Sequence, residues 1–348
     1  MENVRWGIIG CGNVTEVKSG PGFQETPSSS LAHVMRRNGD LARDYARRHG
    51  VPRWSDDARS LLRDPDVDAV YVATPPGSHL EYSLACAEAG KPCYVEKPMA
   101  RNFGECAIMV EAFRQAGVPL FVAYYRRALP RFLKIKAILD SGVLGTLRYV
   151  ALAQDKRAEP EDSDPLRRPW RLTPELSGGG LLLDVGSHTL DLLDFLFGPV
   201  EEVDGYAANR AGLYGPEDFV SGSFRFRSGL AGTGRWCFCS PVDREFVEVV
   251  GDRGLLRFSV YGNEPLRLEC GGTAENIEAP NPVHIQQPLI RTIVEQLTGR
   301  GECPSTGESG SRTSRVMDRL LEGYRRLHGD DGSACFADGA PRQADSPD

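Results

Sequence analysis

A lysine at the end of an apolar run is the first residue in this sequence whose position could support chemistry. The segment Cys93-Tyr94-Val95-Glu96-Lys97-Pro98 predicts a buried strand that ends at Lys97, and Pro98 fixes the turn that follows. Burial and a nearby cation would lower the pKa of Lys97 from its ordinary value of about 10.4, which would allow proton exchange near neutral pH. Glu96 should point the opposite way along the strand, so we expect it to contact a cofactor or to support the fold.

An aspartate and a histidine four residues apart form a second candidate group. Asp184 and His188 follow the run Gly178-Gly179-Gly180, and on a helix this spacing places both side chains on one face. His188 can shuttle a proton because its ordinary pKa is about 6.5, while Asp184 can hold a substrate hydroxyl or orient the imidazole. The glycine run would let the backbone come close to a ligand or to a neighbouring element. No third ligand stands at a recognisable spacing, so we expect no metal.

These groups match the needs of hydride transfer to or from a carbinol carbon. The hydroxyl proton must leave in one direction and return in the other, which requires a group within hydrogen-bond reach of one oxygen. We expect His188 to exchange this proton, with Lys97 polarising the same oxygen. The opposite assignment, in which Lys97 exchanges the proton, stays open.

A glycine-rich turn near the N-terminus predicts a dinucleotide-binding site. Gly10-Cys11-Gly12-Asn13-Val14-Thr15 directly follows the apolar run Val4–Ile9, with Thr15 where a third Gly or Ala is usual. Gly10 permits a tight turn, and Gly12 lets the backbone approach a pyrophosphate at the N-terminus of the next helix. We therefore expect cofactor binding by Gly10, Gly12, Asn13 and Val14.

Two arginines indicate which dinucleotide would bind. The second predicted strand is followed by Arg36-Arg37-Asn38, where an NAD-binding chain would place an acid that accepts from the ribose 2′-hydroxyl. A guanidinium pairs with a 2′-phosphate, so Arg36 and Arg37 favour NADP, with NAD as the alternative. Both arginines could instead be solvated surface charges. Before this strand, the Gly- and Pro-rich segment 18–23 predicts a broken or shortened helix without an assigned role.

The elements that must position these residues begin with an alternating pattern. Up to residue 123, short apolar runs alternate with helical stretches, of which 40–49, 80–89 and 103–116 are each followed closely by a glycine. Strand and helix in alternation predict a parallel sheet covered by helices on both faces, which is the α/β class.

The pattern changes after residue 145. Longer alternating runs predict a mainly antiparallel sheet, closed by helices at 283–297 and 308–327. We therefore expect two domains, at 1–124 and 125–328, and a poorly ordered tail at 329–348.

Composition and charge restrict the possible partners. The 348 residues carry 41 basic and 48 acidic side chains, and the formal net charge of −7 argues against nucleic acid or an anionic membrane as the main partner. Nine scattered cysteines without a CxxC pair indicate free thiols and a cytoplasmic location. We expect no signal peptide, and no apolar run is long enough to cross a bilayer.

Three motifs together resemble one family of oxidoreductases. They are Ala73-Thr74-Pro75-Pro76-Gly77-Ser78-His79, then Glu96-Lys97-Pro98, then the glycine run with Asp184 and His188. With these motifs after the glycine turn, the sequence resembles the glucose–fructose oxidoreductase, inositol dehydrogenase and rhizopine catabolism (Gfo/Idh/MocA) family from about residue 4 to residue 327. Pro76, where Asn is frequent, departs from the family pattern.

The resemblance implies a fold, a catalytic group and a partner. The fold would be an N-terminal Rossmann domain followed by an α+β domain with a large, mainly antiparallel open sheet. The outer face of that sheet would form a homodimer or homotetramer. Lys97, Asp184 and His188 would be the catalytic group and contact the substrate, Glu96 and Lys97 would face the cofactor, and a cis peptide would precede Pro98.

Further residues are weaker candidates for the site. Thr74, Pro75 and His79 would lie at the cofactor, with His79 near the nicotinamide. Arg126 could reach a substrate oxygen, and the pair Trp170-Arg171 could form a wall of the substrate pocket. For His79, for Arg126 and for this pair, a packing or surface role is equally compatible with the sequence.

The expected function is that of an NAD(P)-dependent oxidoreductase. It would transfer a hydride between a nicotinamide and a carbinol or carbonyl of a sugar, inositol or similar polyol. One alternative is an NAD-dependent glycoside hydrolase on the same fold, which Arg36 and Arg37 disfavour. Another is a non-enzymatic NADP(H)-sensing protein, which would not need a proton shuttle. No substrate signature stands out in the sequence.

Overall fold

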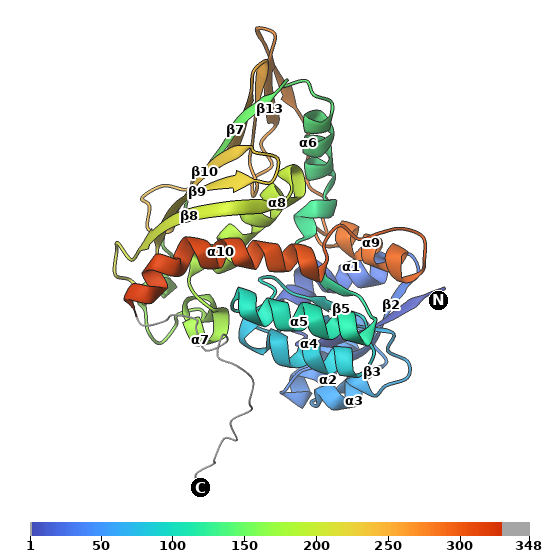
Figure 1. Cartoon of the computed structure of the whole chain (residues 1–348). Coiled ribbons are helices and arrows are strands. Elements are labelled where there is room, and N and C mark those ends of the chain that lie inside the picture. The colour runs from blue at the N-terminus through green and yellow to red at the C-terminus, as the bar shows by residue number, and fades with distance from the viewer. Residues whose placement is uncertain (1, 329–348) are drawn as a thin grey trace.

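Two β-sheets of different kinds organise the computed structural model, which describes residues 2–328 (Figure 1). The first is a parallel sheet near the N-terminus, and the second is an open sheet of eight strands in the C-terminal half. The long helix α10 (Gly307–Leu327) runs between them (Figure 1). The predicted tail at 329–348 lies outside the described residues.

The first sheet has the Rossmann arrangement. Its six strands follow the order β3-β2-β1-β4-β5-β6, and every neighbouring pair is parallel. The strands are β1 (Val4–Ile9), β2 (Ser29–Met35), β3 (Arg53–Ser55), β4 (Ala69–Val72), β5 (Cys93–Val95) and β6 (Leu120–Val122). Because the strands share one direction, their carboxyl ends meet along one edge, with the topological switch point between β1 and β4. The predicted parallel sheet is confirmed, although the short strand β3 was not predicted.

Helices on this sheet begin and end at the residues that favour such ends. They are α2 (Gly39–His49), α3 (Ala58–Leu62), α4 (His79–Glu88) and α5 (Phe103–Ala116). Asn38 and Asn102 cap α2 and α5 by accepting backbone N–H bonds through their side chains. Gly50 and Gly117 follow these helices with φ of +65° and +66°, a conformation that glycine adopts without strain. The predicted helices are confirmed, and only the five-residue α3 is additional.

The segment 18–23 continues as helix, so the prediction of a broken or shortened helix is wrong. Thr15–Ser19 forms a π-helical turn, η1, and α1 (Gly20–Glu25) follows it directly. Pro21 lies in the first turn of α1, where a missing backbone N–H costs little. Gly22 permits close packing on the helix α9 (Gln287–Leu297), because a Cβ at this position would lie 3.0 Å from Ile290.

The second sheet is mainly antiparallel, as predicted. Its strand order is β14-β13-β12-β11-β7-β10-β9-β8, and only the neighbours β7 and β10 are parallel. The strands are β7 (Leu147–Asp155), β8 (Val200–Ala208), β9 (Phe219–Phe226), β10 (Ala231–Cys237), β11 (Arg244–Gly251), β12 (Gly254–Phe258), β13 (Leu266–Cys270) and β14 (Thr273–Ile277). Strand β14 was not predicted because its residues are mostly polar and exposed.

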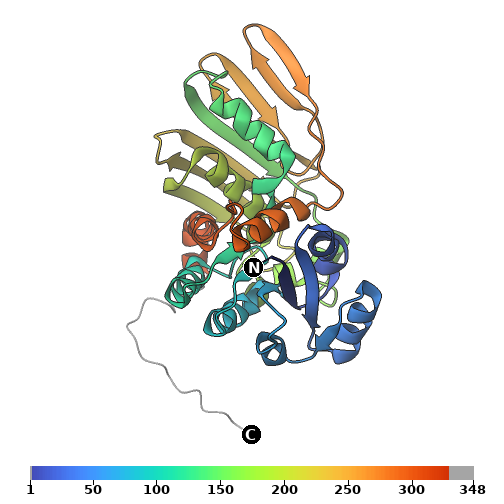
Figure 2. The ribbon, with the colours of Figure 1, turned by 90° about the vertical axis from the view of Figure 1, so that its right-hand side faces the viewer.

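Helices α6 (Pro130–Asp140) and α8 (Ser187–Phe197) lie against one face of this sheet (Figure 2). The strand register places Tyr149 and Tyr206 on the opposite face, where both side chains are exposed. Helices α9 and α10 correspond to the two predicted closing helices, whereas α6 was not predicted. Helix α10 packs on β8 and α5, so it contacts both the open sheet and a helix that covers the parallel sheet.

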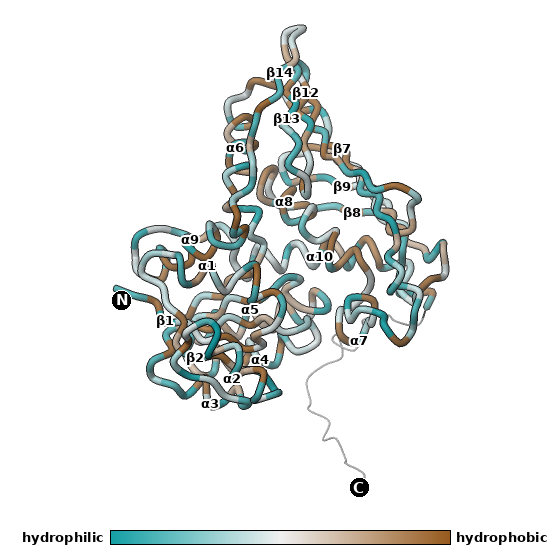
Figure 3. Tube along the Cα trace, turned by 180° about the vertical axis from the view of Figure 1, so that it is seen from behind, coloured by the Kyte–Doolittle hydropathy of each residue, from teal (hydrophilic) through white to brown (hydrophobic). Residues whose placement is uncertain are grey.

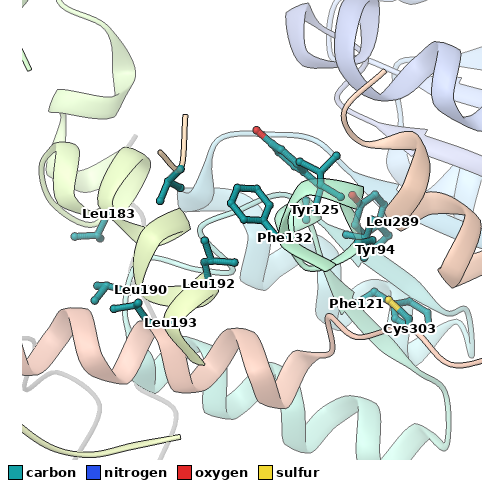
Figure 4. Packing of buried hydrophobic residues seen from close by; sticks show 14 of the residues in the cluster. Tyr94, Phe121, Tyr125, Phe132, Leu183, Leu190, Leu192, Leu193, Leu289 and Cys303 are labelled. Carbon is teal, nitrogen blue, oxygen red and sulfur yellow. The ribbon is translucent and has the colours of Figure 1, made fainter. Parts of the chain in front are cut away.

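One continuous hydrophobic core joins the two domains. Figure 4 shows Tyr94 and Phe121 of the parallel sheet in the same cluster as Leu190, Leu192 and Leu193 of α8. Hydrophobic stretches of α1, α9 and α10 lie where the two domains meet (Figure 3). A second cluster fills the other face of the parallel sheet, beneath α4 and α5. Because a large apolar interface restrains domain motion, residues contributed by the two domains keep fixed relative positions.

Buried ion pairs join three segments within the C-terminal half of the protein. Arg127, which follows β6, contacts Asp191 at 2.8 Å and Asp194 at 2.9 Å on α8. Arg312 of α10 contacts Asp194 at 2.7 Å. Each of these two carboxylates of α8 therefore has a guanidinium partner that offsets the cost of burying its charge.

Two chemical expectations concern the chain as a whole. The eight cysteines within residues 2–328 are all free, in agreement with their scattered spacing. Over the same residues, none of the helices combines the length and the apolar character needed to span a membrane.

Candidate active site

The turns after β1, β4 and β5 open into a cavity of about 820 Å³. Trp170, Asp184 and His188 close it from the C-terminal domain. The cavity lies at the switch point of the parallel sheet, where open α/β sheets bind ligands. One site therefore receives residues from both domains.

Most of the predicted site residues line this cavity. They are Gly10, Gly12, Asn13, Val14, Arg36, Arg37, Thr74, Pro75, Glu96, Lys97, Trp170, Asp184 and His188. His79, Arg126 and Arg171 are not among the lining residues. The expected cis peptide is present between Lys97 and Pro98.

An ion pair between Lys97 and Asp184 lies in the cavity wall. Lys97 Nζ donates to the carboxylate Oδ1 of Asp184 at 2.6 Å and to its main-chain oxygen at 2.9 Å. Both side chains are largely buried, with 16% and 13% of their surface exposed. The end of β5 positions the lysine, and the π-helical turn η6 (Leu182–Gly186) positions the aspartate. Two segments that are remote in sequence thus fix one ammonium group.

The pKa of Lys97 moves in the direction opposite to the expected one. Burial disfavours the ammonium, but attraction to the Asp184 carboxylate more than offsets this effect and raises the pKa above its ordinary value of 10.5. Asp184 has a pKa below its ordinary value, because Lys97 and Arg171 outweigh the effect of burial. The expectation of a lowered lysine pKa is therefore wrong, and Lys97 is a hydrogen-bond donor at neutral pH.

His188 has the opposite electrostatic character. Burial, followed by the positive charges of Arg126, Lys97 and Lys18, holds the pKa of its imidazole well below 6.5. Its ring makes edge-on contacts with Tyr125, at a centroid distance of 5.2 Å, and with other aromatic rings. At neutral pH the site therefore combines a neutral imidazole with a charged lysine.

Glu96 supports the strand end from behind Lys97. Its Oε1 accepts from Tyr71 at 2.5 Å and from Gln286 Nε2 at 2.8 Å, and its Oε2 accepts from the backbone N–H of Lys97 at 3.1 Å. Glu96 also lines the cavity. The hydrogen bonds give Glu96 the structural role that the sequence had left as one of two alternatives.

The glycine turn has the shape that a dinucleotide requires. Gly10 has φ of +92°, and a Cβ there would lie 2.8 Å from Thr74, so no larger residue fits between β1 and β4. A Cβ at Gly12 would meet only the Gly10 carbonyl oxygen within 4 Å, at 3.8 Å, so the space beyond this residue is open. The helical turn η1 starts directly afterwards, with Thr15 donating to the carbonyl of Gly12. These residues fit a pyrophosphate at a helix N-terminus.

Arg36 and Arg37 line the cavity beyond the carboxyl end of β2. Both side chains are exposed, and Arg36 Nη1 lies 3.5 Å from the carbonyl oxygen of Cys11. Asn38, the next lining residue, caps α2. The lining residues that directly follow β2 are thus Arg36, Arg37 and Asn38, and none of these three is an acid.

The glycine run before Asp184 approaches protein backbone. Gly178 has φ of +85°, and a Cβ there would lie 2.2 Å from the carbonyl oxygen of Arg101. A Cβ at Gly180 would lie 2.7 Å from the carbonyl oxygen of Glu217. Of the two expected reasons for these glycines, the structure supports close contact with neighbouring elements.

Comparison with known proteins agrees with this fold. Residues 4–124 match a model described as an oxidoreductase family with an NAD-binding Rossmann fold, and residues 132–257 match the GFO/IDH/MocA C-terminal domain. The chain is 39% identical to Oxidoreductase P35 of Formosa agariphila over 318 residues, which cover 90% of this chain and 97% of that protein. The chain belongs to the Gfo/Idh/MocA family of oxidoreductases.

Other proteins similar to this one have named activities. The 1,5-anhydro-D-fructose reductase of Ensifer adhaerens is 29% identical over 311 residues, which cover 88% of this chain and 92% of that protein. The crystal structure of an aldose-aldose oxidoreductase from Caulobacter crescentus complexed with glycerol has a TM-score of 0.82 and 26% identity. It covers 93% of this chain and 98% of the other. The predicted family is confirmed, and the protein is an oxidoreductase.

Three predicted site residues of this Gfo/Idh/MocA protein lie outside the cavity lining. His79 is buried, and its ring nitrogens lie 2.7 Å from the Thr74 carbonyl and 3.1 Å from the Pro98 carbonyl. It therefore ties the turn after β4 to the turn after β5. Arg126 is buried behind Tyr125, and Arg171 contacts the Asp184 carboxylate at 3.5 Å.

The sequence analysis missed several of the residues that line the cavity. Lys18, Tyr125 and Gln286 line the cavity. Lys18 belongs to the segment that was predicted as a broken helix, and Tyr125 follows β6 among several buried aromatic residues. Gln286 lies in a loop next to Gln287, and nothing in its local sequence indicates a site. Only the folded chain brings these residues to the cavity that Lys97, Asp184 and His188 line.

Proposed function

We propose that this protein transfers a hydride between a nicotinamide dinucleotide and a carbinol or carbonyl carbon of a sugar, inositol or similar polyol. One observation carries the proposal: the glycine turn, Lys97, Asp184 and His188 line a single cavity. The named activities of the 1,5-anhydro-D-fructose reductase and the aldose-aldose oxidoreductase support this substrate class.

The protein's own residues would handle the proton. A nicotinamide bound beside Lys97 would supply or accept the hydride. In oxidation, the neutral imidazole of His188 accepts the carbinol proton, while Lys97 Nζ donates a hydrogen bond to the same oxygen and stabilises its developing charge. In reduction, His188 returns the proton to that oxygen. Asp184 keeps Lys97 charged and oriented through two accepted hydrogen bonds.

NADP as the preferred cofactor is part of this proposal. Arg36 and Arg37 offer two exposed guanidinium groups at the end of the cavity that follows β2. A 2′-phosphate would gain charge-assisted hydrogen bonds there, whereas the 2′-hydroxyl of NAD would lack its usual carboxylate partner. NAD stays the alternative.

Turnover by variants at Lys97 and His188 tests the proposal. The purified protein is supplied with NADP or NAD and a panel of aldoses, inositols and anhydro sugars, and reduced nicotinamide is followed by its absorbance. We expect Lys97→Met and His188→Ala each to lower kcat/KM by about 10²–10⁴-fold, because each removes a group at the reacting oxygen. Lys134→Met is the matched control, since Lys134 is an exposed lysine on α6.

A binding measurement separates loss of chemistry from loss of structure. Both variants should still bind the reduced dinucleotide, as measured by its fluorescence, because the glycine turn is unchanged. Turnover by Lys97→Met equal to that of the wild type would contradict the proposal, as would the absence of turnover by the wild type across the whole panel.

Three broader features belong to the same proposal. Residues 1–124 would bind the dinucleotide and residues 125–328 the substrate, since both ranges contribute to the cavity. The sheet face with the exposed side chains of Tyr149 and Tyr206 would form a homodimer or homotetramer, whose mass light scattering would measure. The free cysteines support a cytoplasmic location.

A further inference from the structure

A lysine without a partner faces the same cavity as Lys97 and His188. Lys18 lines the cavity from the π-helical turn η1 and makes no ion pair or hydrogen bond with a side chain in the described part of the protein. Burial has the largest effect on the low pKa of His188, and the charge of Lys18 lies near enough to contribute to it. An exposed lysine on a cavity wall can be a solvated surface charge, so the neighbouring charges must show whether it binds a ligand.

A second cation, Arg126, lies behind the cavity wall, and one of its nitrogens has no hydrogen-bond partner within residues 2–328. Arg126 is 7% exposed, and its Nε donates to the carbonyl oxygen of Val260 at 3.1 Å. Its Nη1 is buried and has no hydrogen-bond partner within residues 2–328. The guanidinium lies over the rings of Tyr125 and Tyr261, at 5.1 Å and 4.6 Å from their centroids, and Tyr125 lines the cavity. Arg126 thus adds positive charge directly behind the site.

The acids beside these cations are already engaged. Asp184 is shared by Lys97 at 2.6 Å and Arg171 at 3.5 Å, so its single charge faces two cations. Glu96 accepts hydrogen bonds on both of its carboxylate oxygens, including one from Gln286. The part of the cavity around Lys97 and His188 therefore carries an excess of positive charge, which favours an anionic ligand.

The other two acids on the cavity wall lie on different elements. Glu81 belongs to α4, close to Tyr82 and to Arg37 at the expected cofactor end. Glu175 is an exposed residue of the short helix α7 (Pro174–Ser177). Neither of them forms an ion pair with Lys18.

We propose that the substrate is a sugar acid, whose carboxylate binds Lys18 while its reacting carbinol lies at Lys97 and His188. This inference rests on the proposed function and names its substrate class. A carboxylate would complete the ion pair that Lys18 lacks, through a charge-assisted hydrogen bond. A neutral polyol would provide no negative charge to balance Lys18 and Arg126.

The donor groups favour a carboxylate over a phosphate. Phosphates bind where several backbone N–H groups converge at a helix N-terminus, and in this protein the turn at 10–14 offers that arrangement. Lys18 lies beyond this turn and presents a single ammonium. One charge on the protein matches one charge on the ligand, so the turn would hold the cofactor phosphates and Lys18 the carboxylate of the substrate.

Matched pairs of acid and neutral substrates test this inference. The pairs are D-gluconate and D-glucitol, D-glucuronate and D-glucose, and D-galacturonate and D-galactose, with D-glucose 6-phosphate as the phosphate probe. We expect at least one acid to exceed its neutral partner in kcat/KM by about tenfold or more. Lys18→Met should lower kcat/KM for that acid by about 10- to 100-fold, mainly through KM, and remove most of its advantage over the neutral partner. Lys18→Arg should restore most of the loss, and Lys134→Met should change neither value.

A binding experiment makes the result independent of turnover. Binding of D-gluconate and D-glucitol to the wild-type protein with NADPH is measured by ligand-observed NMR, and the acid should bind more tightly and lose this advantage in Lys18→Met. Turnover of the neutral partners without preference for any acid would overturn the inference and leave the proposed function standing. Preference for the phosphate probe would overturn the carboxylate assignment. Weaker NADPH binding in Lys18→Met, with an unchanged ratio of acid to neutral turnover, would assign Lys18 to the cofactor instead.

Discussion

Asp184 keeps Lys97 in its charged form at the candidate active site. Lys97 is largely buried, and burial alone would favour a neutral amine, yet the carboxylate at 2.6 Å raises its pKa. His188 lies among cations and aromatic rings and has a lowered pKa. The two candidate proton-exchanging groups therefore differ in protonation state at neutral pH, which favours the imidazole as acceptor and the ammonium as donor of a hydrogen bond.

Replacing Asp184 should move the pH dependence of carbonyl reduction. The ammonium of Lys97 must be present to hold the carbonyl oxygen, so activity is lost as pH rises through the pKa of Lys97. In Asp184→Asn the attraction disappears while burial remains, so this pKa falls. We expect the alkaline limb of kcat/KM to shift to lower pH by about 1–3 units, measured between pH 6 and 11 with NADPH and a carbonyl substrate.

The control for this shift is Asp252→Asn, because Asp252 pairs with Arg148 at an exposed position at 3.4 Å. Its profile should coincide with that of the wild type. An alkaline limb in Asp184→Asn that coincides with the wild-type limb would show that Lys97 does not titrate in this step.

At the scale of elements, close approach between backbone segments holds Asp184 in place. The chain reaches Asp184 through Gly178 and Gly180, which abut the backbone of Arg101 and Glu217. Lys97 lies four residues before Arg101. The glycine run therefore joins the segment that carries the aspartate to the segment that carries the lysine.

Two glycines with positive φ allow the energetic cost of backbone strain to be distinguished from the cost of steric overlap. Gly178 has φ of +85° and its Cβ would overlap the Arg101 carbonyl oxygen, whereas Gly90 has φ of +64° and nothing within 4 Å of a Cβ. We expect Gly90→Ala to lower the free energy of unfolding by about 1–2 kcal/mol from the backbone conformation. Gly178→Ala should cost roughly 2–5 kcal/mol, since steric overlap adds to that strain. Urea unfolding measures both, and equal losses in the two variants would contradict the close contact.

At the scale of the whole molecule, Arg127 joins the segment that directly follows the Rossmann domain to α8 through buried charges. It contacts Asp191 and Asp194 of α8 directly after the last strand of the Rossmann domain, and Arg312 brings α10 into the same network. The shared hydrophobic core surrounds this network. The relative position of the two halves of the site depends on this shared core, and none of the charged residues of the network lines the cavity.

Removing Arg127 should destabilise the protein strongly. Arg127→Met would leave the carboxylate of Asp191 buried without its cation, which costs about 3–5 kcal/mol of unfolding free energy. Chemical denaturation measures the loss, and we expect the C-terminal half of the site to unfold at lower denaturant. Arg148→Met is the control, because its pair with Asp252 is exposed and should contribute little. Similar midpoints for the two variants would contradict a structural role of the network.

The sequence by itself determined the local order of the chain. Apolar runs of the right length, glycines after helices and the turn at 10–14 predicted the Rossmann sheet, the antiparallel sheet and the dinucleotide site. The motifs around Lys97, Asp184 and His188 predicted three residues that line one cavity. These features follow from periodicity and backbone conformation, which depend on neighbouring residues and can therefore be read locally.

The tertiary structure decided the charge states and the remaining cavity residues. The pKa of Lys97 was predicted in the wrong direction, because its shift depends on a carboxylate 87 residues away. Arg126 was expected at the substrate but lies behind Tyr125, and Lys18 was assigned to a broken helix but lines the cavity. Electrostatic interactions act through space and change with burial, so only the folded arrangement of remote segments sets them.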